Sequence, residues 1–228
     1  MKLTRVFAPG MVLLCMLWAM AGTATAHDFN PPPWRDLTHP FSTLQGWDFL
    51  TPANPATPDH PGLPLVVGDG FGGGLPTATM FNMQWNPGSP TDFPGVWGPN
   101  DPSGGFILLD IPNWIDTEPI KWISVQTTFI GSNPPLITNI FGDESGQAVF
   151  GVPIAPPLVT PLDPLNGIFG VTEQWEMRPN PDWETIEIFV PPDVAIDQIV
   201  VDTISFPEPG SMALVAIGLA VVMRRHRG

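Results

Sequence analysis

The sequence predicts an all-β protein, a β-sandwich or jelly roll, and three observations support this fold class. Apolar and polar residues alternate with a period of two in many short runs. Turn-forming residues separate these runs, with 31 prolines and 23 glycines in a chain of 228 residues. Between residues 27 and 206, no stretch of ten or more residues free of proline and glycine has the pattern of an amphipathic helix. Many short strands without intervening helices favour a sandwich.

The region 104–206 has the clearest strand patterns and is expected to form the main part of the sandwich. The run GGFILLDIPN places Phe106 and Leu108 on one face of a strand and three aliphatic residues on the other. Similar alternation follows in KWISVQTTFI, ETIEIFV and IDQIVVDTIS. Strands are expected at 104–113, 119–130, 146–152, 167–177, 184–190 and 195–205. Within the later strands, the residues expected to share one face are Ile123, Val125, Thr127 and Phe129, then Ile186, Ile188 and Val190, then Ile199, Val201 and Thr203.

The preceding region, 27–103, is rich in proline and glycine and is expected to add mostly loops to the same sandwich. Fifteen prolines lie between Pro31 and Pro102, and stretches such as TPANPATPDHPGLP cannot sustain a helix. Short strands are expected near 46–50, 65–67 and 77–85.

The N-terminal segment 1–26 has the three parts of a secretory signal peptide, which is expected to be a helix. Two basic residues precede an apolar run, and Ala24 and Ala26 form a small-x-small site. Signal peptidase is therefore expected to cut before His27. The single cysteine, Cys15, lies within this segment, so the mature chain has no thiol for a disulfide or for catalysis.

The C-terminal segment 207–228 has three parts of its own. Pro207, Glu208 and Pro209 precede the apolar run 211–223, which as a helix would be about 20 Å long. A hydrocarbon core is about 30 Å thick, so this short membrane helix suits a transient anchor better than a permanent one. The arginines that follow are expected to stop transfer and stay in the cytoplasm. They are Arg224, Arg225 and Arg227.

This segment resembles the PEP-CTERM sorting signal of Gram-negative bacteria. The resemblance implies an exported protein that is anchored briefly in the inner membrane and processed near the P-E-P motif by an exosortase. It implies delivery to the cell surface or the extracellular matrix, where such proteins are associated with exopolysaccharide and biofilm. The body, from about 105 to 206, resembles exported β-sandwich proteins through LDIPN, KWISVQTTF, RPNPDWETIEIFV and IDQIVVDTIS.

Charge and composition exclude several classes of function. Residues 27–206 contain 21 acidic residues and three basic ones, Arg35, Lys121 and Arg178, so no nucleic-acid partner is expected. The histidines lack the spacing of a metal-binding motif. The acidity is compatible with a structural Ca²⁺, but the sequence does not identify its ligands. GDGFGGG has the G-x-G-x-x-G spacing, but no helix follows to receive a phosphate. No cofactor is expected.

The sequence contains no catalytic motif, and a non-enzymatic surface or matrix protein is the leading hypothesis. The first alternative is a carbohydrate-binding module, in which Trp114 and Trp183, both beside turn residues, would stack on sugar rings. The second is a polysaccharide hydrolase with two facing carboxylates. Candidate pairs for the hydrolase are Asp143 with Glu144, Glu173 with Glu176, and Asp116 with Glu118.

Overall fold

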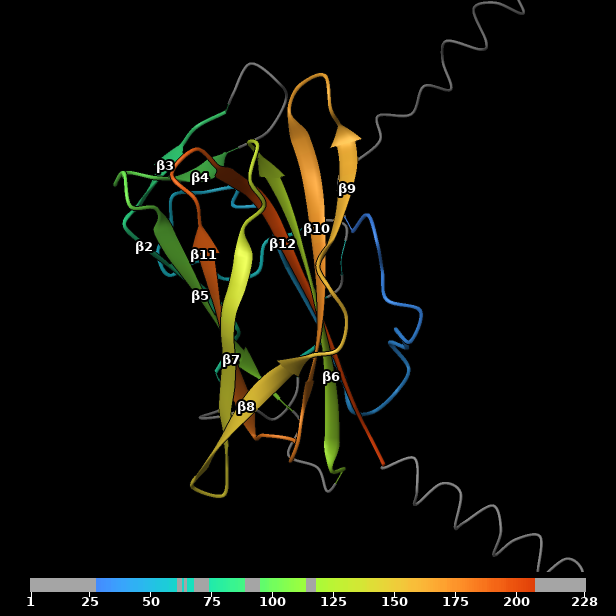
Figure 1. Cartoon of the computed structure of the whole chain (residues 1–228). Coiled ribbons are helices and arrows are strands. Elements are labelled where there is room, and N and C mark those ends of the chain that lie inside the picture. Colours follow the sequence, from blue (N-terminus) through green and yellow to red (C-terminus); the bar gives the residue numbers. More distant parts are fainter. Residues whose placement is uncertain are drawn as a thin grey trace, which may run out of the picture.

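The computed structural model describes residues 28–60, 63, 65–67, 74–88, 95–113 and 118–207. Across these residues the fold is all-β, as predicted, and contains strands without a helix (Figure 1). The strands are β1 (Ser42–Trp47), β2 (Thr77–Phe81), β3 (Met83–Asn86), β4 (Val96–Pro99), β5 (Gly105–Pro112), β6 (Ile120–Ile130), β7 (Leu136–Glu144), β8 (Gln147–Pro153), β9 (Leu158–Asp163), β10 (Ile168–Met177), β11 (Trp183–Val190) and β12 (Ala195–Phe206).

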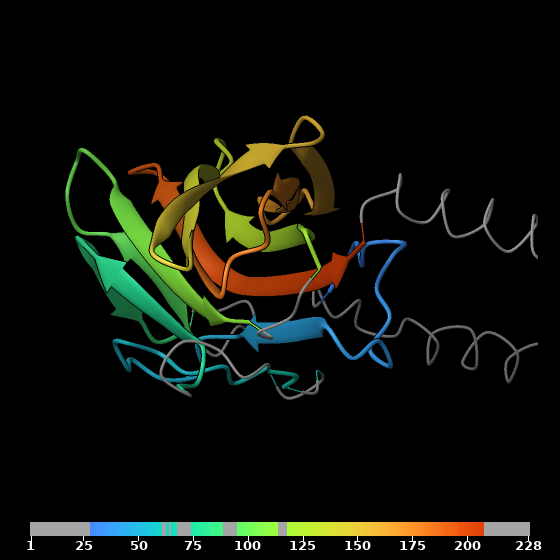
Figure 2. The ribbon, with the colours of Figure 1, turned by 90° about the horizontal axis from the view of Figure 1, so that it is seen from below.

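The strands form two antiparallel sheets that pack face to face (Figure 2). In sheet A, β10, β6 and β12 lie side by side, with β1 and the β4–β3 pair next to β12 and with β9 next to β10. Sheet B has the order β2-β5-β11-β7-β8. β8 pairs with β7 along its first half and with β10 along its second half, so the two sheets are continuous along one side.

The core lies between the two sheets and follows the predicted alternation. Ile107, Leu109 and Ile111 of β5 are buried, whereas Phe106 and Leu108 on the other face are partly exposed. The residues predicted to share a face on each later strand are also buried. Aromatic rings add to the core from sheet A and from the loop after β1; these are Trp47, Phe49, Trp97, Phe129 and Trp175.

The predicted strands agree with the structure where alternation is regular and depart from it elsewhere. All six strands predicted between 104 and 206 are present, and β7 and β9 occur in addition. In the earlier region, β1 begins four residues before the predicted 46–50, and 65–67 makes a single bridge, between Val66 and Leu44. The run 77–85 divides into β2 and β3 because Asn82 adopts a positive φ of 55°.

The outer face of sheet A is polar, yet it is buried. Gln126 and Thr128 on β6 and Asp202 on β12 lie on this face and are almost inaccessible to solvent. The segment 28–36, which we call the strap, runs across the strands outside the sheet (blue in Figures 1 and 2). The strap covers these polar side chains, so they are buried although they lie outside the core.

Side-chain hydrogen bonds hold the strap on sheet A. Asn30 makes two of these bonds: its backbone N–H donates to Gln126 Oε1 at 2.8 Å, and its side-chain amide donates to Thr172 Oγ1 at 3.0 Å. Arg35 donates to Asp28 within the strap and to Asp202 of β12, and its side chain is 15% exposed. Gln126, Thr172 and Asp202 thereby each receive a hydrogen bond from the strap, which satisfies groups that would otherwise be costly to bury.

Candidate functional site

Six aromatic side chains project from the outer face of sheet B and remain at least partly accessible to solvent. Alternation places them opposite the core side of five strands, from β2 to β8. We call this surface the aromatic face. Its rings are Phe81, Phe106, Phe141, Phe150, Trp183 and Phe189.

The aromatic face has two clusters of rings at opposite ends of β11. At one end Phe189 pairs in register with Phe106, their ring centroids 5.4 Å apart, and Phe81 of β2 pairs in register with Phe106. At the other end Trp183 and Phe141 meet edge to face, with centroids 6.3 Å apart. Trp183 and Phe189 are six residues apart on one strand, so roughly 20 Å separates the two clusters.

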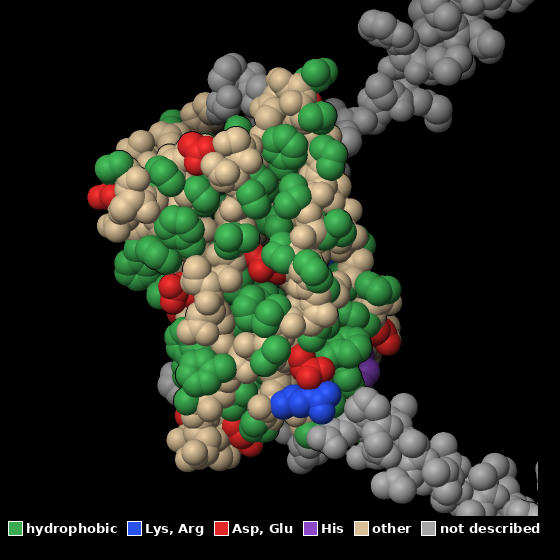
Figure 3. Space-filling model, viewed as in Figure 1, with side chains coloured by type: hydrophobic (Ala, Val, Ile, Leu, Met, Phe, Trp, Pro, Cys, Tyr) green, Lys and Arg blue, Asp and Glu red, His purple; other side chains and the backbone are tan. Residues whose placement is uncertain are grey.

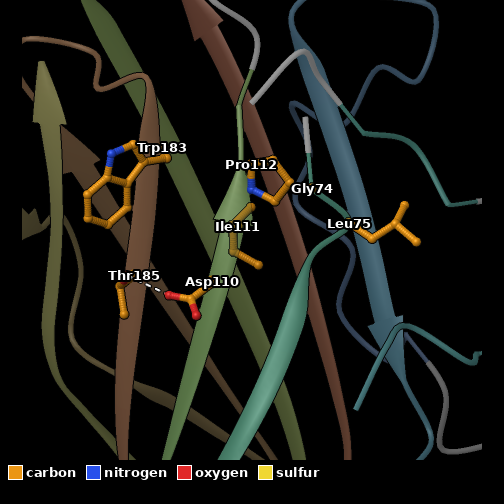
Figure 4. Close-up of a pocket in the computed structure, with 7 residues that line it drawn as sticks. All are labelled: Gly74, Leu75, Asp110, Ile111, Pro112, Trp183 and Thr185. Carbon is orange, nitrogen blue, oxygen red and sulfur yellow. Dashed lines mark hydrogen bonds between the residues drawn. The ribbon is translucent and has the colours of Figure 1, made fainter. Parts of the chain in front are cut away.

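A pocket of about 330 Å³ adjoins the cluster that contains Trp183 (Figure 4). Trp183 lies on one side of it, Leu75 lies on the segment that leads into β2 on the other, and Asp110 lies between them. The remaining lining residues are Gly74, Ile111, Pro112 and Thr185. The pocket is therefore mostly apolar, with one carboxylate.

Polar groups lie between the two aromatic clusters. Thr185 Oγ1 donates to Asp110 Oδ1 at 2.8 Å, which holds that carboxylate in the pocket (Figure 4). Glu187 lies two residues after Thr185 on β11, and it accepts a hydrogen bond at its Oε1 from Thr138 Oγ1 at 3.0 Å. Each carboxylate keeps a further oxygen for other donors. In Figure 3, hydrophobic side chains cover much of this side of the molecule and single acidic side chains lie between them.

The structure places one of the two tryptophans that the sequence suggests for glycan contact. Trp183 is partly exposed at the pocket, as its position after the turn NPD indicates. Trp114 lies outside the described residues. Sequence reasoning missed Asp110 and the phenylalanines, because their contribution depends on the pairing of β5, β7 and β11, which no local pattern reveals.

Two of the three acid pairs suggested for glycoside hydrolysis lie within the described residues, and neither faces a common cleft. Asp143 and Glu144 are consecutive on β7 and therefore point to opposite faces. Glu173 is buried on the inner face of β10, where Ile137 N donates to it, and Glu176 lies on the outer face beside Arg178. For the third pair, Asp116 lies outside the described residues.

Charged side chains gather at a second place, near the end of β1. Asp48 is buried, receives a hydrogen bond from Gln198 at 2.8 Å and lies 3.9 Å from His60 Nε2. Burial and the nearby Asp48 raise the pKa of Asp197 to about 7. Within the described residues, no three His, Cys, Asp or Glu side chains are arranged to hold a metal ion. His39 instead caps a turn, since its Nδ1 accepts from Phe41 N.

The last strand leads directly to the P-E-P motif. The ring of Phe206 meets Trp122 of β6 edge to face, with centroids 4.5 Å apart, and Trp122 lies 6.3 Å from Trp34 of the strap. Phe206 also pairs in register with Ile120 at the start of β6. β12 thus ends at Phe206, packed against β6, at the residue before Pro207.

The remaining residues proposed for targeting lie outside the described part of the chain. They are Ala24, Ala26, His27, Glu208, Pro209, Arg224, Arg225 and Arg227. Among the described residues, no helix is long and apolar enough to cross a membrane; the apolar run 211–223 is not among them.

Comparison with known proteins identifies the C-terminal segment. No curated protein and no solved structure matches the chain. A family model for the PEP-CTERM protein-sorting motif matches residues 207–227, beginning at the residue that follows β12. The resemblance noted in the sequence is therefore confirmed for this segment. The chain carries a PEP-CTERM protein-sorting motif, which marks it as an exported protein that an exosortase sorts to the cell surface.

Proposed function

We propose that the protein is a non-enzymatic component of the cell surface or extracellular matrix of a Gram-negative bacterium, associated with exopolysaccharide. The observation that carries this proposal is the junction between the sandwich and the sorting motif: β12 ends at Phe206 and the motif begins at Pro207. The apolar run 211–223 holds the exported chain in the inner membrane until processing near Pro207–Pro209 releases the sandwich.

Two further features support a non-enzymatic role. The two suggested acid pairs that lie within the described residues, Asp143 with Glu144 and Glu173 with Glu176, point to opposite faces of their strands. The excess of acidic residues between 27 and 206 favours solubility outside the cell and discourages association with nucleic acid.

The sorting part of the proposal is tested with the full-length chain and two variants in a host that has the exosortase. One variant lacks 207–228, and the other replaces Pro207, Glu208 and Pro209 by Ala-Gln-Ala and keeps the apolar run. Wild type should reach the cell surface with a trimmed C-terminus, and the substituted variant should stay untrimmed in the membrane fraction. Identical fractionation and C-terminal mass for the wild type and the Ala-Gln-Ala variant would contradict the proposal.

A carbohydrate-binding module is the second candidate function, and the position of Trp183 favours it. An indole ring that is partly exposed beside a pocket offers a flat apolar surface for the C–H face of a sugar, and Asp110 offers an acceptor for its hydroxyl groups. Incubation of the protein with soluble polysaccharides separates the candidates: a module binds them without release of reducing ends, and release of reducing ends would indicate an enzyme.

A further inference from the structure

We infer that the aromatic face binds an uncharged polysaccharide along β11, with the two ring clusters as separate contact points and the carboxylates between them. This inference rests on the second candidate function and extends the site from one tryptophan to the whole face. Three features of the described residues carry it: the spacing of the rings, the position of the polar groups and the charge of the face.

The rings are arranged for a long ligand. Phe81 is 47% exposed and lies in register beside the Phe106–Phe189 pair, so this cluster presents an apolar surface across three strands. Trp183 and Phe141 present a second surface roughly 20 Å away along the same sheet. A monosaccharide could contact only one cluster, whereas an extended glycan chain can contact both, and two linked contacts raise the apparent affinity above that of either alone.

The groups between the clusters match the hydroxyl groups of sugars. Asp110 and Glu187 are each held by a threonine hydroxyl and keep acceptor sites for further donors. Hydrogen bonds to ionised acceptors are stronger than those between neutral groups, so these carboxylates can fix the orientation of a chain that stacks on the rings.

The charge of the face selects among polysaccharides. The three lysine and arginine residues of the described part lie elsewhere: Arg35 is in the strap, Lys121 is in the core and Arg178 pairs with Glu176. The acidic groups on the face are therefore not neutralised by a basic side chain from that part of the chain, and they repel uronic acids and sulfated sugars. A polycationic chain would be attracted by the acidic surface in general rather than by this face. The charge of the face therefore favours an uncharged polysaccharide.

The test is affinity electrophoresis of the full-length chain in mild detergent, with polysaccharide cast into the gel. The probes are hydroxyethyl cellulose, galactomannan and glycol chitin, which are uncharged, and polygalacturonate, which is anionic. Trp183→Ala and Phe81→Ala each remove one contact point, and Leu165→Ala is the matched control because that side chain is 96% exposed in a loop away from the face. Circular dichroism and thermal unfolding establish that each variant is folded.

We expect at least one uncharged polysaccharide to retard the wild type and polygalacturonate to leave it unchanged. Each aromatic substitution should raise the dissociation constant about tenfold, and Leu165→Ala should not. If only Trp183→Ala weakened binding, the extended site would be refuted while the second candidate function stood. If no uncharged polysaccharide bound, or if polygalacturonate bound more tightly, both would be refuted. None of these outcomes bears on sorting, which depends on residues 207–228 and is measured separately.

Discussion

Lys121 and Glu184 form an ion pair between the two sheets, with 2.5 Å between Nζ and Oε2 and with neither side chain exposed to solvent. Burial raises the pKa of Glu184, and the Lys121 ammonium opposes that rise. Glu184 Oε1 has no hydrogen-bond partner among the described residues. The core thus contains an ion pair. It also contains a buried hydrogen bond, from Asn113 Nδ2 to Asn180 Oδ1 at 3.0 Å.

Removal of one partner of this pair should destabilise the fold strongly. Glu184→Gln removes the anion that pairs with the buried Lys121 ammonium, so we expect the free energy of unfolding to fall by about 3–5 kcal/mol. Lys121→Met combined with Glu184→Leu removes both charges and should recover most of that loss. Urea denaturation of the full-length chain measures the effect. As a control, Glu176→Gln affects the exposed pair with Arg178 and should cost less than about 1 kcal/mol. Equal losses in the two glutamine variants would argue against a special role for burial.

The strap should depend on Arg35 in a way that varies with pH. Burial raises the pKa of Asp202 to about 6, and the hydrogen bonds and charge of Arg35 oppose that rise. Arg35→Ala leaves Asp202 buried without a cation and raises its folded-state pKa further. A carboxyl group whose pKa is raised in the folded state adds to the free energy of unfolding at low pH. That stabilisation is lost as the pH rises through the pKa of the folded state. The variant should lose about 2–3 kcal/mol at pH 8 and less at pH 5. A pH-independent loss equal to that of Arg178→Ala would contradict this prediction.

The sequence predicted the strands in which apolar and polar residues alternate regularly, and it missed the irregular ones. β7 was missed because its buried residues, Ile137 and Ile140, are three apart rather than two or four. The register against β11 shifts between Ile137 and Asn139, so Thr138 is an extra residue that breaks the alternation. β9 was missed because it contains Pro161, which is tolerated there since β9 pairs with β10 alone.

The candidate site was predictable only in part for a related reason. A tryptophan beside turn residues is expected to be accessible, and Trp183 is. The partners of Trp183 come from strands far apart in sequence, and Asp110 reaches the pocket because it pairs in register with Thr185. Likewise, a lysine is normally expected at the surface, so nothing local predicts that Lys121 is buried opposite Glu184.

A substitution on β10 should loosen the strap without any change in charge. A Cβ atom at Gly170 would lie 2.3 Å from the ring of Phe29, so Gly170→Ala must displace Phe29 from sheet A. Trypsin cuts after arginine, and cleavage after Arg35 reports on how often the strap leaves the sheet. We expect Gly170→Ala to be cut there several-fold faster than wild type, as followed by mass spectrometry. Gly98→Ala is the control, since its nearest neighbouring atom would be 3.8 Å away. Equal cleavage rates in the two variants would show that Phe29 does not hold the strap.

Asp197 should make the fold less stable as pH rises through neutrality. Burial and the charge of Asp48 raise its pKa to about 7, against 3.8 in the unfolded chain. Between these values the folded state binds more protons at Asp197 than the unfolded state does, so the contribution of Asp197 to stability is greatest below pH 4 and declines up to about pH 7. At pH 8 Asp197→Asn should therefore be more stable than wild type by about 2 kcal/mol, and the difference should shrink at pH 5. Urea denaturation across this range measures it.

The control for that prediction is Asp193, a solvent-exposed carboxylate nearby in the sequence. A hydrogen bond from Ser132 lowers the pKa of Asp193, so this group is ionised in both the folded and the unfolded chain above pH 5. Asp193→Asn should therefore shift stability by the same amount at every pH from 5 to 8. If Asp197→Asn gave the same flat profile, Asp197 would be ionised in the folded protein throughout this range, and the pH dependence would have to come from Asp202, the other buried carboxylate whose pKa is raised.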